Sequence, residues 1–96
     1  MEQISVKQLQ KKLAEEEDLF LLDVREEYEH KEFNIGGKLI PLDQIVRKAA
    51  EIPMEKPVIV YCRKGIRSQI AIQRLEQKFN FANLINLAGG IQNWPF

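Results

Sequence analysis

The chain has 96 residues, of which 45% are hydrophobic and 29% are charged. This length and composition are typical of one compact globular domain and exclude a disordered or collagen-like chain, so we expect residues 1–96 to form a single domain. Fourteen Lys and Arg residues balance fourteen Asp and Glu residues, which leaves no overall positive field to attract nucleic acid or an anionic membrane.

The sequence also bounds the location and the redox chemistry of the chain. No apolar stretch approaches the ~20 residues that a membrane-spanning helix needs, and the first residues lack the basic flank and apolar block of a signal peptide. We therefore expect a cytoplasmic protein that binds neither a membrane nor nucleic acid. Cys62 is the single cysteine, which excludes an internal disulfide and a metal site built from several cysteines. We predict no metal and no cofactor.

The first half of the chain alternates helical and strand patterns. Ser5 and Gln8 have the spacing of a capping box, and the apolar spacing that follows predicts a helix over 6–16. A continuous apolar run predicts a strand over 19–24 that is buried on both faces. The remaining elements of this half are shorter: a helical segment over 26–33, a turn at Gly36-Gly37, a strand over 38–40 and a helix over 42–50.

The second half continues the alternation. Residues 58–62 have the strongest strand pattern of the chain, and apolar residues at helical spacing predict a helix over 68–79. A last strand over 84–87 and a closing helical turn over 91–94 follow. Short strands separated by helices imply βαβ crossovers, so we predict an α/β fold with a mostly parallel sheet and helices on both faces.

The loop after Cys62 carries the strongest functional signal. In open α/β sheets, ligands bind beyond the carboxyl ends of the strands, and Cys62 ends the most apolar strand. A loop that runs into a helix N-terminus points several backbone N–H groups at one place, and Gly65 permits the unusual backbone conformation that such a cradle needs. The loop is Arg63-Lys64-Gly65-Ile66-Arg67-Ser68.

The charge near Cys62 favours a reactive thiol. Residues 62–78 contain five basic residues and one Glu, in a chain whose net charge is zero. Helix N-termini and neighbouring cations lower the pKa of a cysteine from about 8.5 to roughly 3.5–7.5, where much of it is ionised. The alternative is a buried cysteine that only fills the core. A basic, glycine-containing loop directly before a helix favours reactivity over that alternative.

The spacing within the loop separates two chemistries that use such a cradle. Phosphatases and related arsenate reductases use Cys-x5-Arg, which holds a tetrahedral oxyanion. Here Cys62 and Arg67 form Cys-x4-Arg. A loop that is one residue shorter makes a tighter cradle, which suits the single outer sulfur of a persulfide better than a phosphate.

This loop, placed between a strand and a helix, resembles the active-site loop of rhodanese-like sulfurtransferase domains. The resemblance extends over nearly the whole chain through three further motifs in the same order: Leu22-Asp23-Val24-Arg25-Glu26 with Glu29, Ile40-Pro41, and Leu87-Ala88-Gly89-Gly90-Ile91 with Trp94. It implies the family's fold, a five-stranded, mainly parallel sheet flanked by helices on both faces.

One segment departs from the family pattern. Many members read Gly-His-Ile-x-Gly-Ala where this chain has Phe33-Asn34-Ile35-Gly36-Gly37. His30 lies four residues too early to replace the family histidine, so we interpret it as a solvated helix residue without a role. The string over 34–42 looks more like the rhodanese domains attached to adenylyltransferases that charge sulfur-carrier proteins.

The resemblance implies a reaction and a site. The Cys62 thiolate would take the outer sulfur of thiosulfate or of another persulfide donor, and a nucleophilic acceptor would then remove it. Backbone N–H groups of residues 63–68 would stabilise the persulfide, and Arg63 and Arg67 would hold an anionic donor, with Lys64 a weaker candidate. Because no second cysteine is present, the acceptor comes from outside: cyanide in an assay, or a small thiol or a sulfur-carrier protein.

Asp23 and Arg25 follow the neighbouring strand and are expected beside the active loop. We favour a supporting role, in which Asp23 caps loop amides and Arg25 pairs with a carboxylate such as Glu29. The acidic segment over 23–32 is either a solvated helix or a docking face for a protein partner.

Two other functions stay open. A cysteine-based phosphatase or arsenate reductase is disfavoured by the Cys-x4-Arg spacing. A non-catalytic binding module with the same fold commonly lacks the cysteine, which this chain retains, although an adaptor that keeps its cysteine also fits the sequence.

Overall fold

The computed structural model describes residues 1–95, and its centre is a sheet of five strands in the order β1-β5-β4-β2-β3. Every strand pairing is parallel, which confirms the predicted sheet and fold class. The strands are β1 (Gln3–Ile4), β2 (Phe20–Asp23), β3 (Lys38–Leu39), β4 (Val58–Tyr61) and β5 (Leu84–Leu87). The edge strand β1 was not predicted, because two residues are too few to form a pattern.

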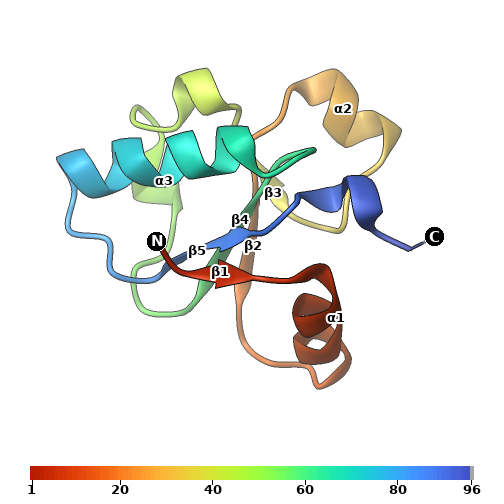
Figure 1. Ribbon diagram of the computed structural model, residues 1–96. Helices are drawn as coiled ribbons and strands as arrows, with labels where there is room; N and C mark the ends of the chain where they lie inside the picture. Colours follow the sequence, from red (N-terminus) through yellow and green to blue (C-terminus); the bar gives the residue numbers. More distant parts are fainter. Residues whose placement is uncertain (96) are drawn as a thin grey trace.

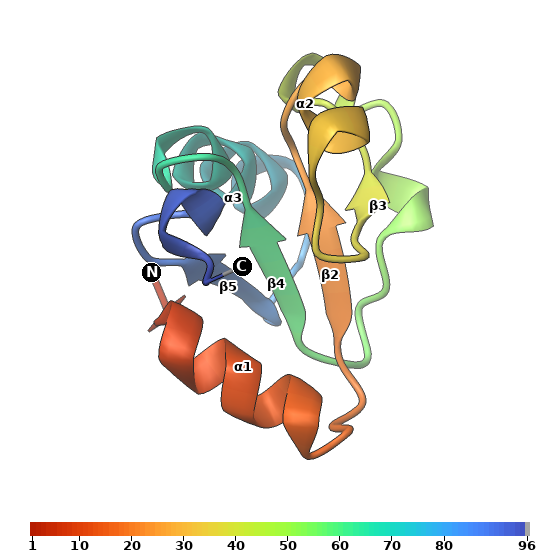
Figure 2. The same ribbon diagram turned by 90° about the vertical axis from the view of Figure 1, so that its right-hand side faces the viewer.

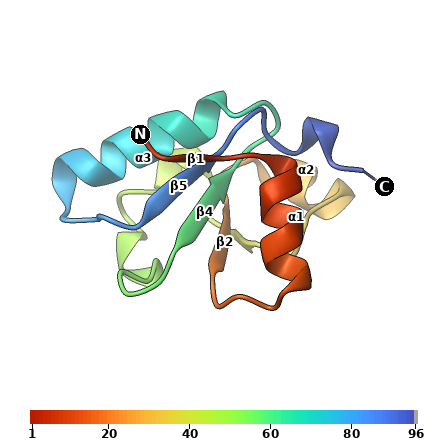
Figure 3. The ribbon, with the colours of Figure 1, turned by 60° about the horizontal axis from the view of Figure 1, so that its bottom comes forward.

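Helices cover both faces of this sheet. Figures 1 and 3 show α1 (Val6–Ala14) on one face and α3 (Ile66–Lys78) on the other. The short helix α2 (Glu27–Glu32) stands beyond the arrowhead of β2, at the carboxyl edge of the sheet (Figure 2). Within residues 1–95, no helix is both long enough and apolar enough to cross a membrane.

Strand β4 shows why its sequence reads as a continuous apolar run. Val58 and Val60 belong to the core on the α3 side, whereas Ile59 and Tyr61 belong to the core on the α1 side. All four side chains are completely buried. Successive residues of a strand point to opposite faces, so a central strand that is covered on both faces is apolar at every position.

The predicted helix over 42–50 is wrong in type. The structure has two 3₁₀ turns there, η1 (Leu42–Gln44) and η2 (Ala49–Glu51). Ile45 and Ala49 are buried as the apolar spacing predicted. Side chains three positions apart share a face in both helix types, so that part of the apolar spacing does not distinguish them.

The carboxyl edge of the sheet brings the functional segments together. β2 and β4 are neighbours in parallel register, with Asp23 opposite Tyr61, so the residues that follow both strands emerge at the same edge. Cys62 follows β4 there. The last helical turn, η3 (Ile91–Asn93), follows β5 and reaches the same edge, as Figure 2 shows in blue beside the start of α3.

Candidate active site

The Cys62 sulfur lies at the centre of the loop that joins β4 to α3. Only 1% of the residue is exposed, and Sγ accepts hydrogen bonds from the backbone N–H groups of Gly65 at 3.1 Å and Ser68 at 3.4 Å. Gly65 has φ +94°, a left-handed conformation that favours glycine. The turn at Gly65 lets α3 begin at Ile66, two residues before the predicted start, so Arg67 and Ser68 lie in its first turn.

Backbone hydrogen bonds from η3, which follows the Gly89-Gly90 turn, hold this loop in place. The N–H groups of Ile91 and Gln92 donate to the carbonyl oxygens of Cys62 and Arg63, both at 3.0 Å. In a trans peptide the N–H points opposite to the C=O, so the N–H groups of Arg63 and Lys64 face away from η3. A Cβ atom on Gly90 would lie 2.2 Å from the Arg63 carbonyl oxygen, so only glycine allows this contact.

A small pocket opens onto Cys62. It has a volume of about 220 Å³ and is lined by Cys62, Arg63, Lys64, Ile66 and Arg67. Its wall is mostly apolar, and the cations Arg63 and Lys64 beside it are exposed. A buried sulfur held by N–H donors, at a pocket with two cations beside it, can attack an anionic donor and stabilise the product.

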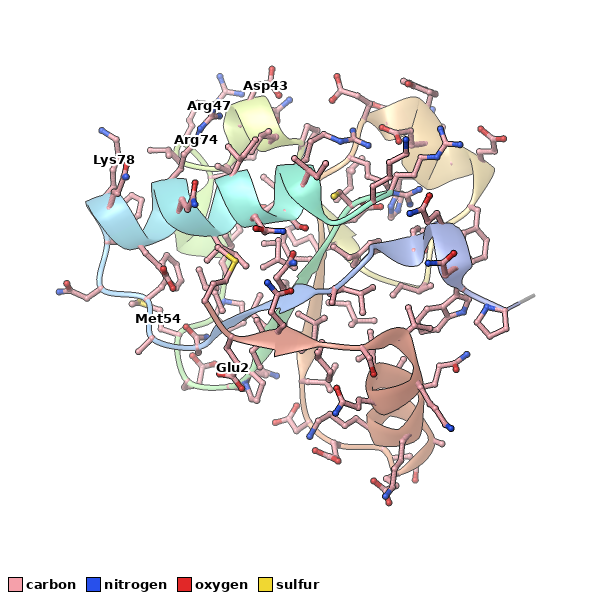
Figure 4. The ribbon with its side chains drawn as sticks, in the orientation of Figure 1. Glu2, Asp43, Arg47, Met54, Arg74 and Lys78 are labelled. Atoms are coloured by element: carbon pink, nitrogen blue, oxygen red, sulfur yellow. The ribbon has the colours of Figure 1, made fainter. Side chains whose placement is uncertain are left out.

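The other basic residues of the segment contribute little here. Figure 4 shows Arg74 and Lys78 along α3, with Lys78 near its far end. Counted along the helix from Arg67, they lie about 10 and 16 Å farther from the loop. The positive charge that the sequence concentrates over 62–78 is therefore spread along α3, and residues 63–67 supply the part that faces the sulfur.

Arg67 joins the loop to α2 through an ion pair. Its Nη1 and Nη2 donate to Oε1 and Oε2 of Glu29 at 2.7 and 2.9 Å. These hydrogen bonds lower the pKa of Glu29 from 4.5 to about 2, and they raise the pKa of Arg67. The carboxylate therefore stays charged through the neutral range, and an anion that binds Arg67 competes with it.

Asp23, Arg25 and His30 form a cluster that differs from the prediction. The fully buried Asp23 carboxylate accepts from the backbone N–H and from Nε and Nη2 of Arg25, at 2.8 to 3.0 Å, and lies 2.8 Å from His30 Nδ1. Arg25 therefore pairs with Asp23 and not with Glu29. Burial opposes the charge of Arg25, but the hydrogen bonds that Arg25 donates to Asp23 hold its pKa above the ordinary value.

This cluster corrects two further expectations. Among residues 1–95, the Asp23 carboxylate contacts Arg25 and His30 and does not cap the loop amides. His30 is not a solvated residue, because its side chain is only 23% exposed and is bonded to a buried carboxylate. Arg25 Nη2 also donates to the Phe33 carbonyl at 2.6 Å, so the cluster ties the two ends of α2 to β2.

Sequence reasoning missed Asn86 and Gln3, which extend from the predicted residue Ser68 on the side of the sulfur away from the pocket. The Ser68 hydroxyl, 3.4 Å from Cys62 Sγ, donates to Oδ1 of the fully buried Asn86, and Asn86 Nδ2 donates to Gln3 Oε1 at 2.8 Å. The only signal was a polar residue in the apolar strand Leu84–Leu87. In the described part of the chain, His, Cys, Asp and Glu form no group of three that could hold a metal ion.

Known proteins are similar to this chain in sequence and in fold. The family described as Rhodanese-like domain matches residues 5–95. A protein named Sulfurtransferase from Allochromatium vinosum is 36% identical over 93 residues, which is 96% of this chain and 86% of that protein. The thiosulfate sulfurtransferase GlpE of Coxiella burnetii is 31% identical over 83 residues, covering 85% of this chain and 77% of GlpE.

Further relatives place the same fold in other contexts. The putative sulfur carrier protein YrkF of Bacillus subtilis is 30% identical, and this chain spans half of its length. The crystal structure of a rhodanese-like domain protein from Staphylococcus aureus is similar with a TM-score of 0.88 and 28% identity, over 99% of this chain and 92% of that one. The match over residues 5–95, together with these relatives, shows that the chain belongs to the family of rhodanese-like domains.

Proposed function

We propose that residues 1–96 act as a single domain that transfers a sulfane sulfur, from thiosulfate or a persulfide donor to a nucleophilic acceptor, through a persulfide on Cys62. One observation carries this proposal. The Cys62 sulfur is buried, accepts two backbone N–H bonds at the start of α3, and borders a pocket whose lining residues include Arg63 and Lys64. Such donors favour the thiolate over the thiol, and the thiolate is the nucleophile.

The first step forms the persulfide. The Cys62 thiolate attacks the outer sulfur of thiosulfate, a new S–S bond forms, and the S–S bond of thiosulfate breaks. The electron pair of the broken bond leaves with sulfite. The negative charge of the Cys62 thiolate is thereby replaced by one on the outer sulfur of the new persulfide. Arg63 and Lys64, which are exposed at the rim of the pocket, attract the thiosulfate dianion and stabilise the leaving sulfite.

The loop amides then hold the persulfide. Gly65 and Ser68 already donate to Sγ, and the first N–H groups of α3, at Ile66 and Arg67, have no partner within the helix. The backbone N–H groups of Arg63 and Lys64 join them, and together these donors surround the position that the outer sulfur takes in the pocket. The positive end of the helix dipole acts in the same direction.

The second step discharges the sulfur to an outside acceptor. The acceptor's nucleophile attacks the outer sulfur, the S–S bond to Cys62 breaks, and the thiolate is restored. Two large side chains are exposed near the pocket, Ile66 at 64% and Tyr28 at 70%. Tyr28 and Arg63 also line a neighbouring depression of about 290 Å³ between α2 and η3. These features suit a thiol or a sulfur-carrier protein that approaches the loop from outside.

A steady-state assay tests the proposal. The purified chain receives thiosulfate and cyanide, and thiocyanate formation is measured. We expect turnover that Cys62→Ser abolishes, because the serine hydroxyl stays protonated at neutral pH and forms no persulfide. Thiocyanate formation at the same rate by Cys62→Ser, or none by the unaltered chain with either thiosulfate or a persulfide donor, would contradict the proposal.

A further inference from the structure

A chain of buried polar groups leads from Cys62 to the edge of the sheet. Cys62 Sγ lies 3.4 Å from Ser68 Oγ, the Ser68 hydroxyl donates to Asn86 Oδ1, and Asn86 Nδ2 donates to Gln3 Oε1 at 2.8 Å. Ser68 and Asn86 are completely buried. Burying polar groups costs free energy unless they are hydrogen-bonded, and each group of this row contacts the next.

The direction of each hydrogen bond follows from the chemistry of the groups. Because Asn86 uses its NH₂ group on Gln3, it presents only its carbonyl oxygen to Ser68. An amide oxygen accepts and cannot donate, so the single hydroxyl proton of Ser68 points to Asn86. Ser68 Oγ then offers a lone pair to the Cys62 sulfur. It can accept the S–H proton of a thiol, but it cannot donate to a thiolate.

We propose that Asn86 and Gln3 are positioning residues that hold the Ser68 hydroxyl proton away from the Cys62 sulfur and so withhold from the thiolate a hydrogen bond that would stabilise it. This inference rests on the proposed function for its purpose. A thiolate becomes a weaker nucleophile as its pKa falls, and the best attacking thiol has a pKa near the ambient pH. The Ser68 hydroxyl would thus act against the backbone N–H groups of Gly65 and Ser68, which donate to the sulfur and favour its charged form.

The charged groups that face the sulfur lie on elements other than β5 and β1, which carry Asn86 and Gln3. Arg63 and Lys64 are in the loop, Arg67 is in α3, and Glu29 on α2 pairs with Arg67. Substitutions at Gln3 or Asn86 leave all four in place. A change in the titration of Cys62 in those variants therefore reports on the row of hydrogen bonds and not on these charges.

The test measures the titration of the thiol itself. Thiolate absorbance in the ultraviolet is followed against pH, with Cys62→Ser in each background as the baseline; Cys62 is the only cysteine. In Asn86→Ala the Ser68 hydroxyl is free to donate to the thiolate, so the pKa of Cys62 should fall by about half to one pH unit. Gln3→Met, at an exposed position, lets the Asn86 amide turn its NH₂ group toward Ser68, and should lower the pKa in the same direction.

Ser68→Ala is the matched background. Without the hydroxyl, neither Asn86→Ala nor Gln3→Met should change the pKa of Cys62. An equal shift in that background, or no shift in folded Gln3→Met with Ser68 present, would overturn the inference, and Gln3→Met decides it if Asn86→Ala fails to fold. Since this titration needs no sulfur donor, a chain that shows the shift but accepts no sulfur would refute the proposed function alone.

Discussion

Replacing Gly90 by alanine should damage both the stability of the chain and the shape of the sulfur-binding loop. A Cβ atom at this position would lie 2.2 Å from the carbonyl oxygen of Arg63, 2.3 Å from its carbonyl carbon and 2.5 Å from the backbone nitrogen of Lys64. All three are backbone atoms, so no side chain can rotate away to make room. Ordinary contacts lie beyond 3.4 Å, so the loop and η3 must separate by about 1 Å.

The cost can be worked from the same contacts. Separation would break or lengthen the hydrogen bonds from Ile91 and Gln92 to the carbonyl oxygens of Cys62 and Arg63, each worth about 1 kcal/mol. Gly90 has φ +68° and ψ −169°, where a residue with a side chain pays about 1–3 kcal/mol. We expect Gly90→Ala to lower the free energy of unfolding by about 3–5 kcal/mol. A displacement of about 1 Å at the reacting group should also slow sulfur transfer by about 100-fold.

Gly36→Ala is the matched control. Gly36 has φ +92°, but a Cβ atom there would meet nothing within 4 Å. Its substitution should cost only the left-handed strain, about 1–2 kcal/mol, and leave the rate unchanged. Urea unfolding followed by circular dichroism gives the stabilities, and thiocyanate formation gives the rates. If the two variants lose equal stability and both transfer sulfur at the original rate, then Gly90 does not support the loop as described.

Three further predictions concern the charged side chains. The folded chain holds the pKa of Glu29 near 2, below its ordinary 4.5, so the pair with Arg67 contributes stability that is fully present above about pH 4.5 and is lost as the pH falls toward 2. Because Arg67 is partly exposed, we expect about 1–2 kcal/mol, seen in urea unfolding at pH 7 and pH 3 and absent in Glu29→Gln. Asp23→Ala should lower the free energy of unfolding by about 3–5 kcal/mol, because it leaves the Arg25 charge buried and unpaired; a loss below 1 kcal/mol in the same titration would refute this. Arg63→Ala should slow transfer from thiosulfate about 10-fold more than transfer from an uncharged persulfide, and equal losses in parallel rate assays would contradict its role in holding the anion.

The sequence predicted the elements that have a strong periodicity. The strand over 84–87 and the capping box of Ser5 and Gln8 agree with the structure, because a short apolar run and cap chemistry are local signals. The start of α3 was placed two residues late, since the left-handed turn at Gly65 ends the loop abruptly. The apolar spacing over 42–50 predicts a helix where the structure has two 3₁₀ turns, because residues three positions apart share a face in both.

The partners of the site residues were harder to predict than the site itself. The Cys62 loop could be found from its own residues, because a basic, glycine-containing turn before a helix has a local signature. The pairing of Arg67 with Glu29 joins residues 38 positions apart, and that of Asn86 with Gln3 joins residues 83 positions apart. Such contacts depend on strand order and register, which no local pattern specifies. They became visible only in the folded chain.

The most direct test of the account is the mass of the intact protein after incubation with thiosulfate. We predict a gain of one sulfur atom in the unaltered chain, no gain in Cys62→Ser, and return to the original mass when cyanide is added. The folding of both proteins is checked by circular dichroism. A folded, unaltered chain that gains no sulfur from thiosulfate or from a persulfide donor, or a Cys62→Ser variant that gains the same mass, would contradict the account.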